Sequence, residues 1–98
     1  MRIIAGRLKG HSLHETHGRK SHPMSEKMRG ALFNALGDID GLSFLDAFAG
    51  SGAVAFEALS RGAACVVAVD QDRSAHSVIE RNAKDLKVGR AVKLIRAN

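Results

Sequence analysis

The chain has 98 residues, of which 45% are hydrophobic and 26% are charged. These proportions are ordinary for a globular protein and exclude a disordered tail, a collagen-like repeat and a disulfide-rich scaffold. The length allows one small domain at most. The single cysteine, Cys65, lies in an apolar run, so it forms no intrachain disulfide and we interpret it as a core residue.

The positive charge is concentrated near the N-terminus. Lys and Arg number 15 and Asp and Glu number 10, so the net charge is +5. Residues 1–30 contain seven bases and two acids, whereas the remaining residues contain eight of each, so the whole excess belongs to the first 30 residues. A basic arm on a neutral body indicates a polyanion partner, usually nucleic acid, or a segment that only improves solubility.

Membrane and secretion signals are missing from this sequence. No apolar stretch approaches the roughly 20 residues of a membrane span. The first residues lack the apolar core of a signal peptide. We therefore expect a cytoplasmic protein without membrane contact.

In chain order, the first expected element is a small basic hairpin over residues 1–14, where Gly6 and Gly10 interrupt short apolar stretches. A polar loop follows. We divide the chain after this loop, into a basic arm at residues 1–22 and a main domain at residues 23–98.

The clearest helix is expected over residues 25–36. Ser25 is suited to cap its N-terminus, and Gly37 is suited to end it. The apolar positions recur at helical spacing and predict one buried face, made of Met28, Ala31, Leu32, Ala35 and Leu36.

Beyond Gly41, strands and helices alternate. Strands are expected over residues 42–46, 65–69 and 92–95, and helices over residues 53–60 and 73–86. The order β-α-β-α-β predicts a parallel sheet with right-handed crossovers, which is half of a doubly wound, Rossmann-like α/β fold. The β-branched run at residues 65–69 predicts a strand buried on both faces.

In doubly wound folds the first strand is central, and the second half of the sheet pairs on its other side. Because this sequence stops at Asn98, we expect strand 42–46 to be an exposed apolar edge and the chain to be the N-terminal portion of a longer protein. Such an edge predicts self-association, by edge pairing or by exchange of the N-terminal segment.

A glycine loop lies between the first of these strands and the following helix. Gly50, Gly52 and Ala55 fit the pattern G-x-G-x-x-G/A in the context that the motif requires. Asp70 ends the next strand 18 positions after Gly52, which suits a carboxylate that binds the ribose hydroxyls of an adenosine cofactor. The alternative is that the glycines only form a turn and Asp70 only caps a loop.

Asp46 distinguishes between adenosine cofactors. It lies four residues before Gly50, where a carboxylate would repel the pyrophosphate of a nicotinamide or flavin dinucleotide. S-adenosylmethionine carries an α-ammonium and a sulfonium instead, and a nearby acid suits both cations. Alternatively, Asp46 caps the following helix. A P-loop is excluded because no Gly-Lys-Ser/Thr follows.

Four histidines, His11, His14, His17 and His22, cluster in the basic arm. They have no Cys partner and only Glu15 as a nearby acid, so we expect solvated or phosphate-facing side chains rather than a metal site. The sequence offers no Ser-His-Asp or Cys-His arrangement, so nucleophilic catalysis has no support.

Three segments resemble one family. They are RIIAGRLKG at residues 2–10, PMSEKMRGALFN at residues 23–34 and FLDAFAGSGAVAFEALSRGA at residues 44–63. They are similar to the bacterial small-subunit (16S) rRNA guanine-N2 methyltransferases, whose members are often labelled N6-adenine-specific DNA methylases. The resemblance extends over essentially the whole chain. It implies a class I methyltransferase fold, S-adenosylmethionine as cofactor, and an exocyclic base amine of rRNA, guanine N2, as target.

The resemblance also implies roles for individual residues. Asp46 and the glycine loop would hold the methionine part of the cofactor, Asp70 its ribose and Asn98 its adenine, within a set that comprises Ser25, Asp46, Ala47, Phe48, Gly50, Ser51, Gly52, Asp70, Gln71 and Asn98. Met24 and Ser25 would belong to a segment that closes over the cofactor. Nucleic acid would contact Arg2, Arg7, Lys9, Arg19, Lys20, Arg29 and Asn34, and its backbone contacts would weaken with salt.

The sequence also departs from the family. His22 and Met24 replace a usual Arg and Thr. The Asp/Asn-Pro-Pro-Tyr/Phe loop that holds the target amine is absent from these 98 residues, so we expect a cofactor-binding fragment without methyl transfer of its own. Two alternatives remain open. One is a non-catalytic nucleic-acid-binding fragment, and the other is a dinucleotide-dependent oxidoreductase, against which Asp46 and the basic arm argue.

Overall fold

The computed structural model describes residues 1–15, 25–47 and 49–97. Its helices and strands, in chain order, are α1 (Glu26–Leu36), β1 (Ser43–Ala47), α2 (Ala53–Ser60), β2 (Cys65–Val69), α3 (Arg73–Asp85), the short 3-10 helix η1 (Gly89–Ala91) and β3 (Val92–Ile95). The β-α-β-α-β order predicted from the sequence is confirmed. No helix in the described ranges combines the length and the apolarity needed to cross a membrane.

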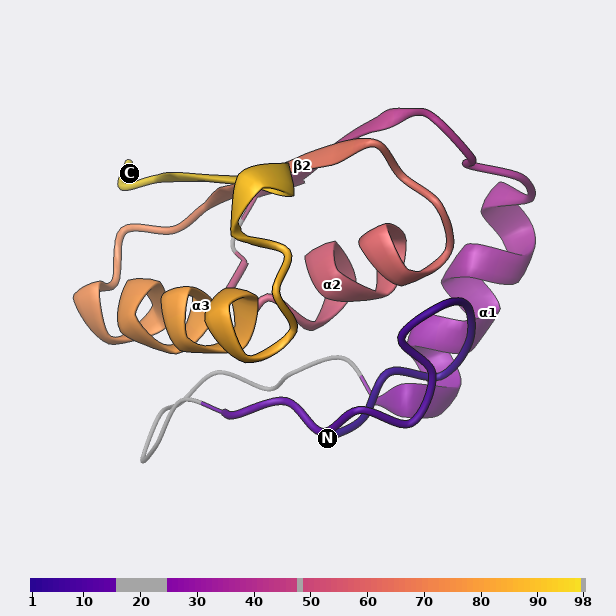
Figure 1. Ribbon diagram of the computed structural model, residues 1–98, viewed down its shortest axis with the longest axis horizontal. Helices are drawn as coiled ribbons and strands as arrows, with labels where there is room; N and C mark the ends of the chain where they lie inside the picture. Colours follow the sequence, from indigo (N-terminus) through magenta and orange to yellow (C-terminus); the bar gives the residue numbers. More distant parts are fainter. Residues whose placement is uncertain (16–24, 48, 98) are drawn as a thin grey trace.

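The strands form a parallel sheet in the order β1-β2-β3. In its register Asp46 lies beside Ala68, and Ala68 lies beside Leu94. Figure 1 shows α2 and α3 on the same side of this sheet, as two right-handed crossovers in one direction require. The first strand is an edge of the described sheet, as predicted, and Leu45 at its centre is 67% exposed.

The second strand, β2, is buried on one face only, so the prediction of burial on both faces is wrong. Val66 and Ala68 are fully buried, whereas their neighbours Cys65, Val67 and Val69 are half-buried. The physical reason is that both helices cover the same face of the sheet. The other face, here called the open face, carries Ser43, Leu45, Ala47, Cys65, Val67, Val69, Lys93 and Ile95.

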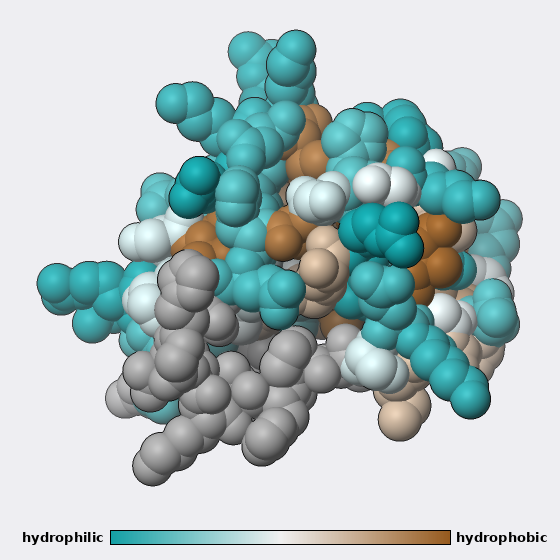
Figure 2. Space-filling view, turned by 90° about the horizontal axis from the view of Figure 1, so that it is seen from below, coloured by the Kyte–Doolittle hydropathy of each residue, from teal (hydrophilic) through white to brown (hydrophobic). Residues whose placement is uncertain are grey.

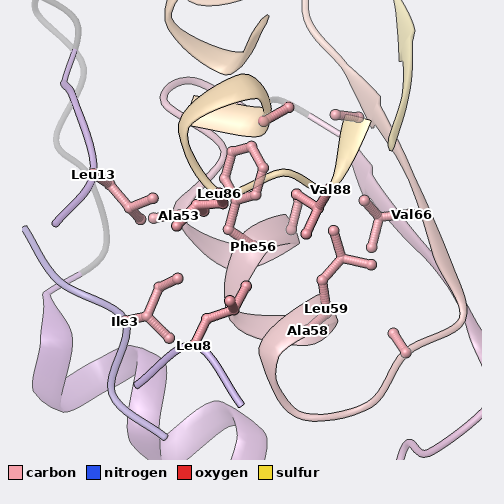
Figure 3. Packing of buried hydrophobic residues seen from close by; sticks show 14 of the residues in the cluster. Ile3, Leu8, Leu13, Ala53, Phe56, Ala58, Leu59, Val66, Leu86 and Val88 are labelled. Atoms are coloured by element: carbon pink, nitrogen blue, oxygen red, sulfur yellow. The ribbon is translucent and has the colours of Figure 1, made fainter. Parts of the chain in front are cut away.

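The helix α2 forms the middle layer of the core. Its sequence, AVAFEALS, is apolar at six of eight positions, and every residue except Val54 is buried, as expected of a helix that is largely apolar around its circumference. The sheet covers one side of it, and Ile3, Leu8 and Leu13 of the N-terminal segment cover the other (Figure 3). Phe56, which is 0% exposed, lies between these two layers.

The helix α1 has the predicted boundaries and caps. The Met28 N–H donates to the Ser25 hydroxyl at 3.0 Å, which satisfies one of the free N–H groups of the first turn. Gly37 ends the helix with a φ of 74°, a conformation that suits glycine.

The predicted buried face of α1 is wrong. Met28 and Leu36 are 60% and 47% exposed, and the buried side chains are Arg29 and Phe33, four residues apart. The ring of Phe33 stacks on Phe44 of β1 with 5.7 Å between centroids. A count of apolar residues cannot find such a face, because one of its two members is an arginine whose charge is neutralised inside the protein.

Residues 1–15, here called the N-terminal segment, fold back on themselves as predicted, although they form a single antiparallel bridge between Arg2 and Ser12 instead of a pair of strands. Gly6 is essential to this turn. It has a φ of +87°, and a Cβ at this position would lie 2.0 Å from the Ser60 carbonyl oxygen. The predicted polar loop and the domain division after residue 22 lie outside the described residues.

Candidate cofactor-binding site

The glycine loop lies at the carboxyl end of β1, where parallel sheets bind their ligands. Its two glycines have different surroundings. Gly52 has a φ of +84°, and a Cβ there would lie 2.7 Å from the ring of Phe56. Gly50 has a φ of +57° and no atom within 4 Å of an added Cβ. Gly52 is therefore required by packing, whereas Gly50 borders open space that a ligand can fill.

Asp70 connects the glycine loop to the start of α3. Its Oδ2 accepts from the Gly50 N–H at 2.9 Å, and its Oδ1 accepts from the Asp72 N–H at 2.9 Å. The side chain therefore caps a loop, as the simpler interpretation of this residue expected. Each carboxylate oxygen has two lone pairs, so this geometry still leaves acceptor capacity for a ribose hydroxyl.

Asp46 is a carboxylate with an unmet interaction. Its pKa is raised from 3.8 to about 6, chiefly by burial; the Ala55 backbone N–H opposes this rise, and the nearby charge of Asp70 adds to it. The bond with Ala55 means that Asp46 helps to cap α2. Its Oδ2, however, is buried and has no hydrogen-bond partner. A buried acceptor of this kind costs free energy until a donor or a cation reaches it.

The donor set at this loop fits a cationic cofactor better than a phosphate. The unpartnered Asp46 oxygen attracts an ammonium group and repels a pyrophosphate. Open space beside Gly50 admits an adjacent chain of atoms. The residues that the structure describes at this loop therefore fit S-adenosylmethionine, whose α-ammonium and ribose would lie toward Asp46 and Asp70.

The remaining predicted cofactor residues lie in varied places. Ala47 and Gln71, which directly follow Asp46 and Asp70 in the sequence, are exposed. Ser51 is buried. The Ser25 hydroxyl is already engaged as the cap of α1. Several predicted residues lie outside the described ranges, namely Arg19, Lys20, Met24, Phe48 and Asn98.

The exposed bases of the N-terminal segment are available to a polyanion. Arg2, Arg7 and Lys9 are all exposed, and so is Asn34 on α1. Hydrophilic side chains dominate the face of the molecule seen from below in Figure 2. Surface bases of this kind can contact a nucleic-acid backbone.

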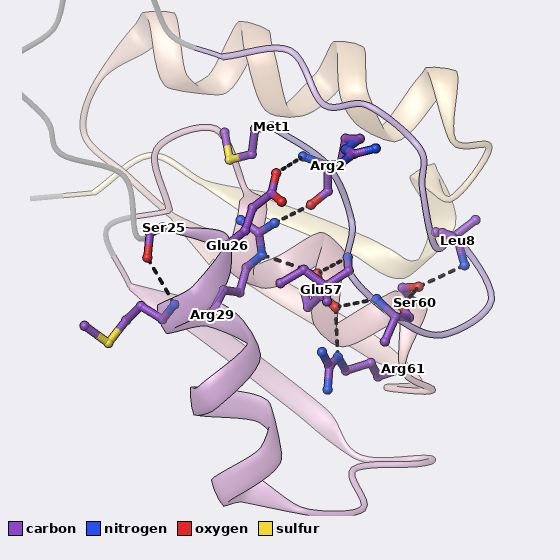
Figure 4. Close-up of polar contacts among 12 residues, drawn as sticks. Met1, Arg2, Leu8, Ser25, Glu26, Arg29, Glu57, Ser60 and Arg61 are labelled. Atoms are coloured by element: carbon purple, nitrogen blue, oxygen red, sulfur yellow. Dashed lines mark hydrogen bonds and ion pairs between the residues drawn. The ribbon is translucent and has the colours of Figure 1, made fainter.

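Arg29 corrects one of the predicted nucleic-acid contacts. The side chain is 0% exposed. Its Nε donates to Glu57 Oε1 at 3.3 Å, and its Nη2 donates to the Arg2 carbonyl oxygen (Figure 4). Arg29 therefore holds α1, α2 and the N-terminal segment together and does not face a substrate in this arrangement.

Glu57 is the residue at this junction that sequence reasoning missed. It is 0% exposed and accepts from the backbone N–H groups of Ile4 and Ala5, at 3.0 and 3.1 Å, and from the side chains of Arg29 and Arg61. A signal was present, because a lone acid in an otherwise apolar helix must find partners when that helix is buried.

The described histidines serve as local contacts. The His11 ring lies 3.0 Å from the Leu8 carbonyl oxygen, and His14 Nε2 lies 2.8 Å from Asp85 Oδ2. His17 and His22 lie outside the described residues. Among the residues that the structure describes, no three His, Cys, Asp or Glu side chains gather as metal ligands would.

The fold is that of the N-terminal part of class I methyltransferases. A solved structure of a candidate methyltransferase from Escherichia coli, yhhF, is 35% identical and superposes with a TM-score of 0.87, covering 100% of this chain and 52% of that one. The C-terminal domain of a precorrin-6Y C5,15-methyltransferase from Rhodobacter capsulatus superposes at 0.73 with 18% identity and shows the fold alone.

The chain belongs to the family described as Conserved hypothetical protein 95, whose model matches residues 1–98. The chain is 38% identical over 97 residues to YlbH of Bacillus subtilis (strain 168), which is named as a candidate rRNA methyltransferase. The matched region covers 98% of this chain and 53% of that protein. It is also 38% identical over 92 residues to ribosomal RNA small subunit methyltransferase D of Escherichia coli (strain K12), covering 93% and 46%. The chain thus spans about half the length of the curated relatives it matches.

Proposed function

We propose that this chain is the cofactor-binding part of an S-adenosylmethionine-dependent methyltransferase that modifies an exocyclic base amine of rRNA, guanine N2. The observation that carries the cofactor is the buried, unpartnered Oδ2 of Asp46 beside an open glycine loop. The names of the related proteins, which are rRNA methyltransferases, support rRNA as the substrate. A cytoplasmic location is part of the same proposal.

The bound cofactor supplies an electrophilic methyl group on a sulfonium, which is transferred by direct displacement once the target amine is correctly oriented. The contribution of this chain is binding and orientation. Asp46 would hold the α-ammonium through its unpartnered oxygen, Gly50 would leave room for the methionine chain, and Asp70, which fixes Gly50 and Asp72, would accept from the ribose.

Nucleic acid is held by the exposed bases of the N-terminal segment, Arg2, Arg7 and Lys9. Contacts of this type position a substrate without reading its sequence, and each one adds to the salt dependence of binding. The 98 residues contain no Asp/Asn-Pro-Pro-Tyr/Phe motif to hold a target amine. We therefore expect this chain to bind both ligands and to transfer no methyl group alone.

The deciding experiment compares two ligands that differ in one group. S-adenosylhomocysteine has an α-ammonium, whereas methylthioadenosine keeps the adenosine and the thioether but lacks the amino acid. Calorimetric titrations would measure the Kd of each for the wild-type chain and for Asp46→Asn, which keeps an acceptor for the Ala55 N–H. Asp38→Asn, a change at an exposed acid, is the matched control.

We expect Asp46→Asn to weaken S-adenosylhomocysteine at least tenfold and to leave methylthioadenosine and the control unchanged, because a charged hydrogen bond contributes about 1.5–3 kcal/mol. Equal losses for both ligands would contradict the assigned role of Asp46. Binding of NAD without binding of S-adenosylhomocysteine would favour the oxidoreductase alternative. Salt-dependent RNA binding with no cofactor binding would favour a non-catalytic nucleic-acid module.

A further inference from the structure

Asn82 is a polar residue on the buried side of α3. Its side chain is 1% exposed and lies in the same helix as the buried apolar residues Ala75, Ile79 and Ala83. A buried amide is tolerated only when its hydrogen bonds are made. The bonds that Asn82 makes join two parts of the molecule that are far apart in the chain.

One part is the end of the N-terminal segment. The His14 N–H donates to Asn82 Oδ1 at 2.8 Å, and Asn82 Nδ2 donates to the His14 carbonyl oxygen at 3.1 Å. The amide of Asn82 therefore forms hydrogen bonds with both polar groups of the His14 backbone. These bonds do not depend on the identity of the side chain at position 14.

The other part is the glycine loop. Asn82 Nδ2 also donates to the Ser51 carbonyl oxygen, at 3.1 Å. An amide nitrogen has two protons, so one serves His14 and the other serves Ser51. A shift of the Ser51 peptide thus changes the orientation of the amide, and with it the His14 backbone.

A second set of anchors reaches the N-terminal segment without touching the loop. Glu57 accepts from Ile4 and Ala5, and the Ser60 hydroxyl accepts from the Leu8 N–H at 2.8 Å. These anchors belong to α2 and fix the middle of the segment. Asn82 joins the end of the segment at His14 to the loop at Ser51, and at the start of the segment the Ser51 hydroxyl donates to Met1 Sδ at the longer distance of 4.0 Å.

We propose that Asn82 is a positioning residue that couples the cofactor loop to the nucleic-acid-binding N-terminal segment, so that the two ligands bind cooperatively. This inference rests on the proposed function. A cofactor that orders the Ser51 peptide also orders Asn82 and the His14 backbone. Coupling of this kind is reciprocal, so RNA strengthens cofactor binding by the factor with which cofactor strengthens RNA binding.

The test measures the Kd of a fluorescein-labelled RNA stem-loop, with guanines in its loop, with and without saturating S-adenosylhomocysteine. The variant is Asn82→Asp, which keeps the acceptor for the His14 N–H and loses both Nδ2 donors. The matched control is Asp85→Asn, on the same helix, because Asp85 contacts the His14 ring and has no bond to Ser51.

In the wild-type chain and in Asp85→Asn we expect S-adenosylhomocysteine to tighten RNA binding at least about fivefold, the lower end of typical couplings. In Asn82→Asp we expect a ratio close to one. Binding of both ligands by the wild-type chain with no coupling would overturn the role of Asn82 and leave the proposed function standing. Failure of S-adenosylhomocysteine to bind would overturn both.

Hydrogen exchange of the wild-type chain keeps the proposal testable if Asn82→Asp does not fold. We expect S-adenosylhomocysteine to slow exchange of the His14 amide at least about fivefold, the same lower limit, because this N–H is bonded to Asn82. The Leu8 amide, bonded to Ser60, is the internal control for global stabilisation by the ligand, and its exchange should slow less than that of His14. Added protection confined to the glycine loop would overturn the proposal.

Discussion

Glu57 and Asp46 are two acids on neighbouring elements, and they differ in how many hydrogen-bond partners their carboxylates have. Glu57 accepts four hydrogen bonds or ion pairs, from Ile4, Ala5, Arg29 and Arg61. Asp46 accepts from one backbone N–H and has a buried oxygen without a partner. A carboxylate with every partner present is a structural junction, and a carboxylate with a partner missing is a place where a ligand is expected.

The largest expected effect comes from removing Glu57, whose two carboxylate oxygens both have partners. Glu57→Ala removes the acid that neutralises Arg29, and a buried charge left unpaired costs about 3–5 kcal/mol. Because a domain of this size has little stability in reserve, we expect the variant to lose cooperative unfolding in a urea titration. Glu80→Ala, at an exposed acid of α3, should change the unfolding free energy by less than about 0.5 kcal/mol. A Glu57→Ala variant as stable as wild type would contradict the junction.

The glycines of the loop give the next largest effect. Gly52→Ala meets both an unfavourable φ and the ring of Phe56, so we expect a loss of about 2–4 kcal/mol in unfolding free energy. Gly50→Ala meets the φ penalty alone, about 1 kcal/mol, but places a methyl group where the cofactor is expected. The Gly50→Ala variant should therefore lose more free energy of S-adenosylhomocysteine binding than free energy of unfolding. Equal stability losses at both positions would contradict the difference in packing.

The free energy of unfolding should decrease as pH rises through the range in which Asp46 ionises. The pKa of Asp46 is raised in the folded protein to about 6, so the folded state binds this proton more tightly than the unfolded chain does. Stability from this group is complete below the ordinary value of 3.8 and is lost as pH rises to about 6.

Asp46→Asn removes that loss, so we expect it to stabilise the chain by about 1–2 kcal/mol above pH 6 and by nothing near pH 4, because the partly exposed carboxylate is still screened by solvent. Urea titrations across this range measure it. In the wild-type chain, affinity for S-adenosylhomocysteine should increase over the same interval, because the ionised carboxylate is the form that attracts the ammonium. A variant stabilised equally at both pH values would refute the link to ionisation.

The smallest expected effect on stability lies on the open face. Leu45→Lys changes a side chain that is already 67% exposed, so unfolding free energy should stay within about 0.5 kcal/mol. We propose that the apolar edge strand β1 makes the chain self-associate, and a lysine there should shift the sedimentation profile toward monomer. Leu36→Lys, at an exposed leucine of α1, is the control. A wild-type chain that sediments as a monomer at high concentration would contradict self-association.

The sequence predicts the regular elements well because their periodicity and punctuation are local properties. Ser25 and Gly37 mark both ends of α1, and the glycine loop lies where its motif predicts it. The prediction of the buried face of α1 is wrong because that face depends on a contact between distant parts of the chain. Arg29 is inside because Glu57 neutralises it, and a partner 28 positions away is invisible to a periodic pattern.

The same limit applies to the candidate site. Asp46, Gly50 and Asp70 were found from a spacing that lies within one β-α-β unit. Asn82 lies at helical spacing from the apolar residues Ala75 and Ile79, and its bonds to His14 and Ser51 depend on tertiary packing. A polar residue at a position predicted to be buried is the signal that would have indicated such a role.

The anchors of the N-terminal segment also set an order of events during synthesis. Its partners lie late in the chain, since Ile4 bonds a residue 53 positions on and His14 a residue 68 positions on. Contacts of such long range form after local ones, and a ribosome delivers the N-terminus first. The residues that are synthesised first are therefore the last to adopt their native conformation. Until Glu57 and Ser60 of α2 and then Asn82 of α3 have been made, these anchors are missing, and the basic segment is a cationic tail that can contact RNA.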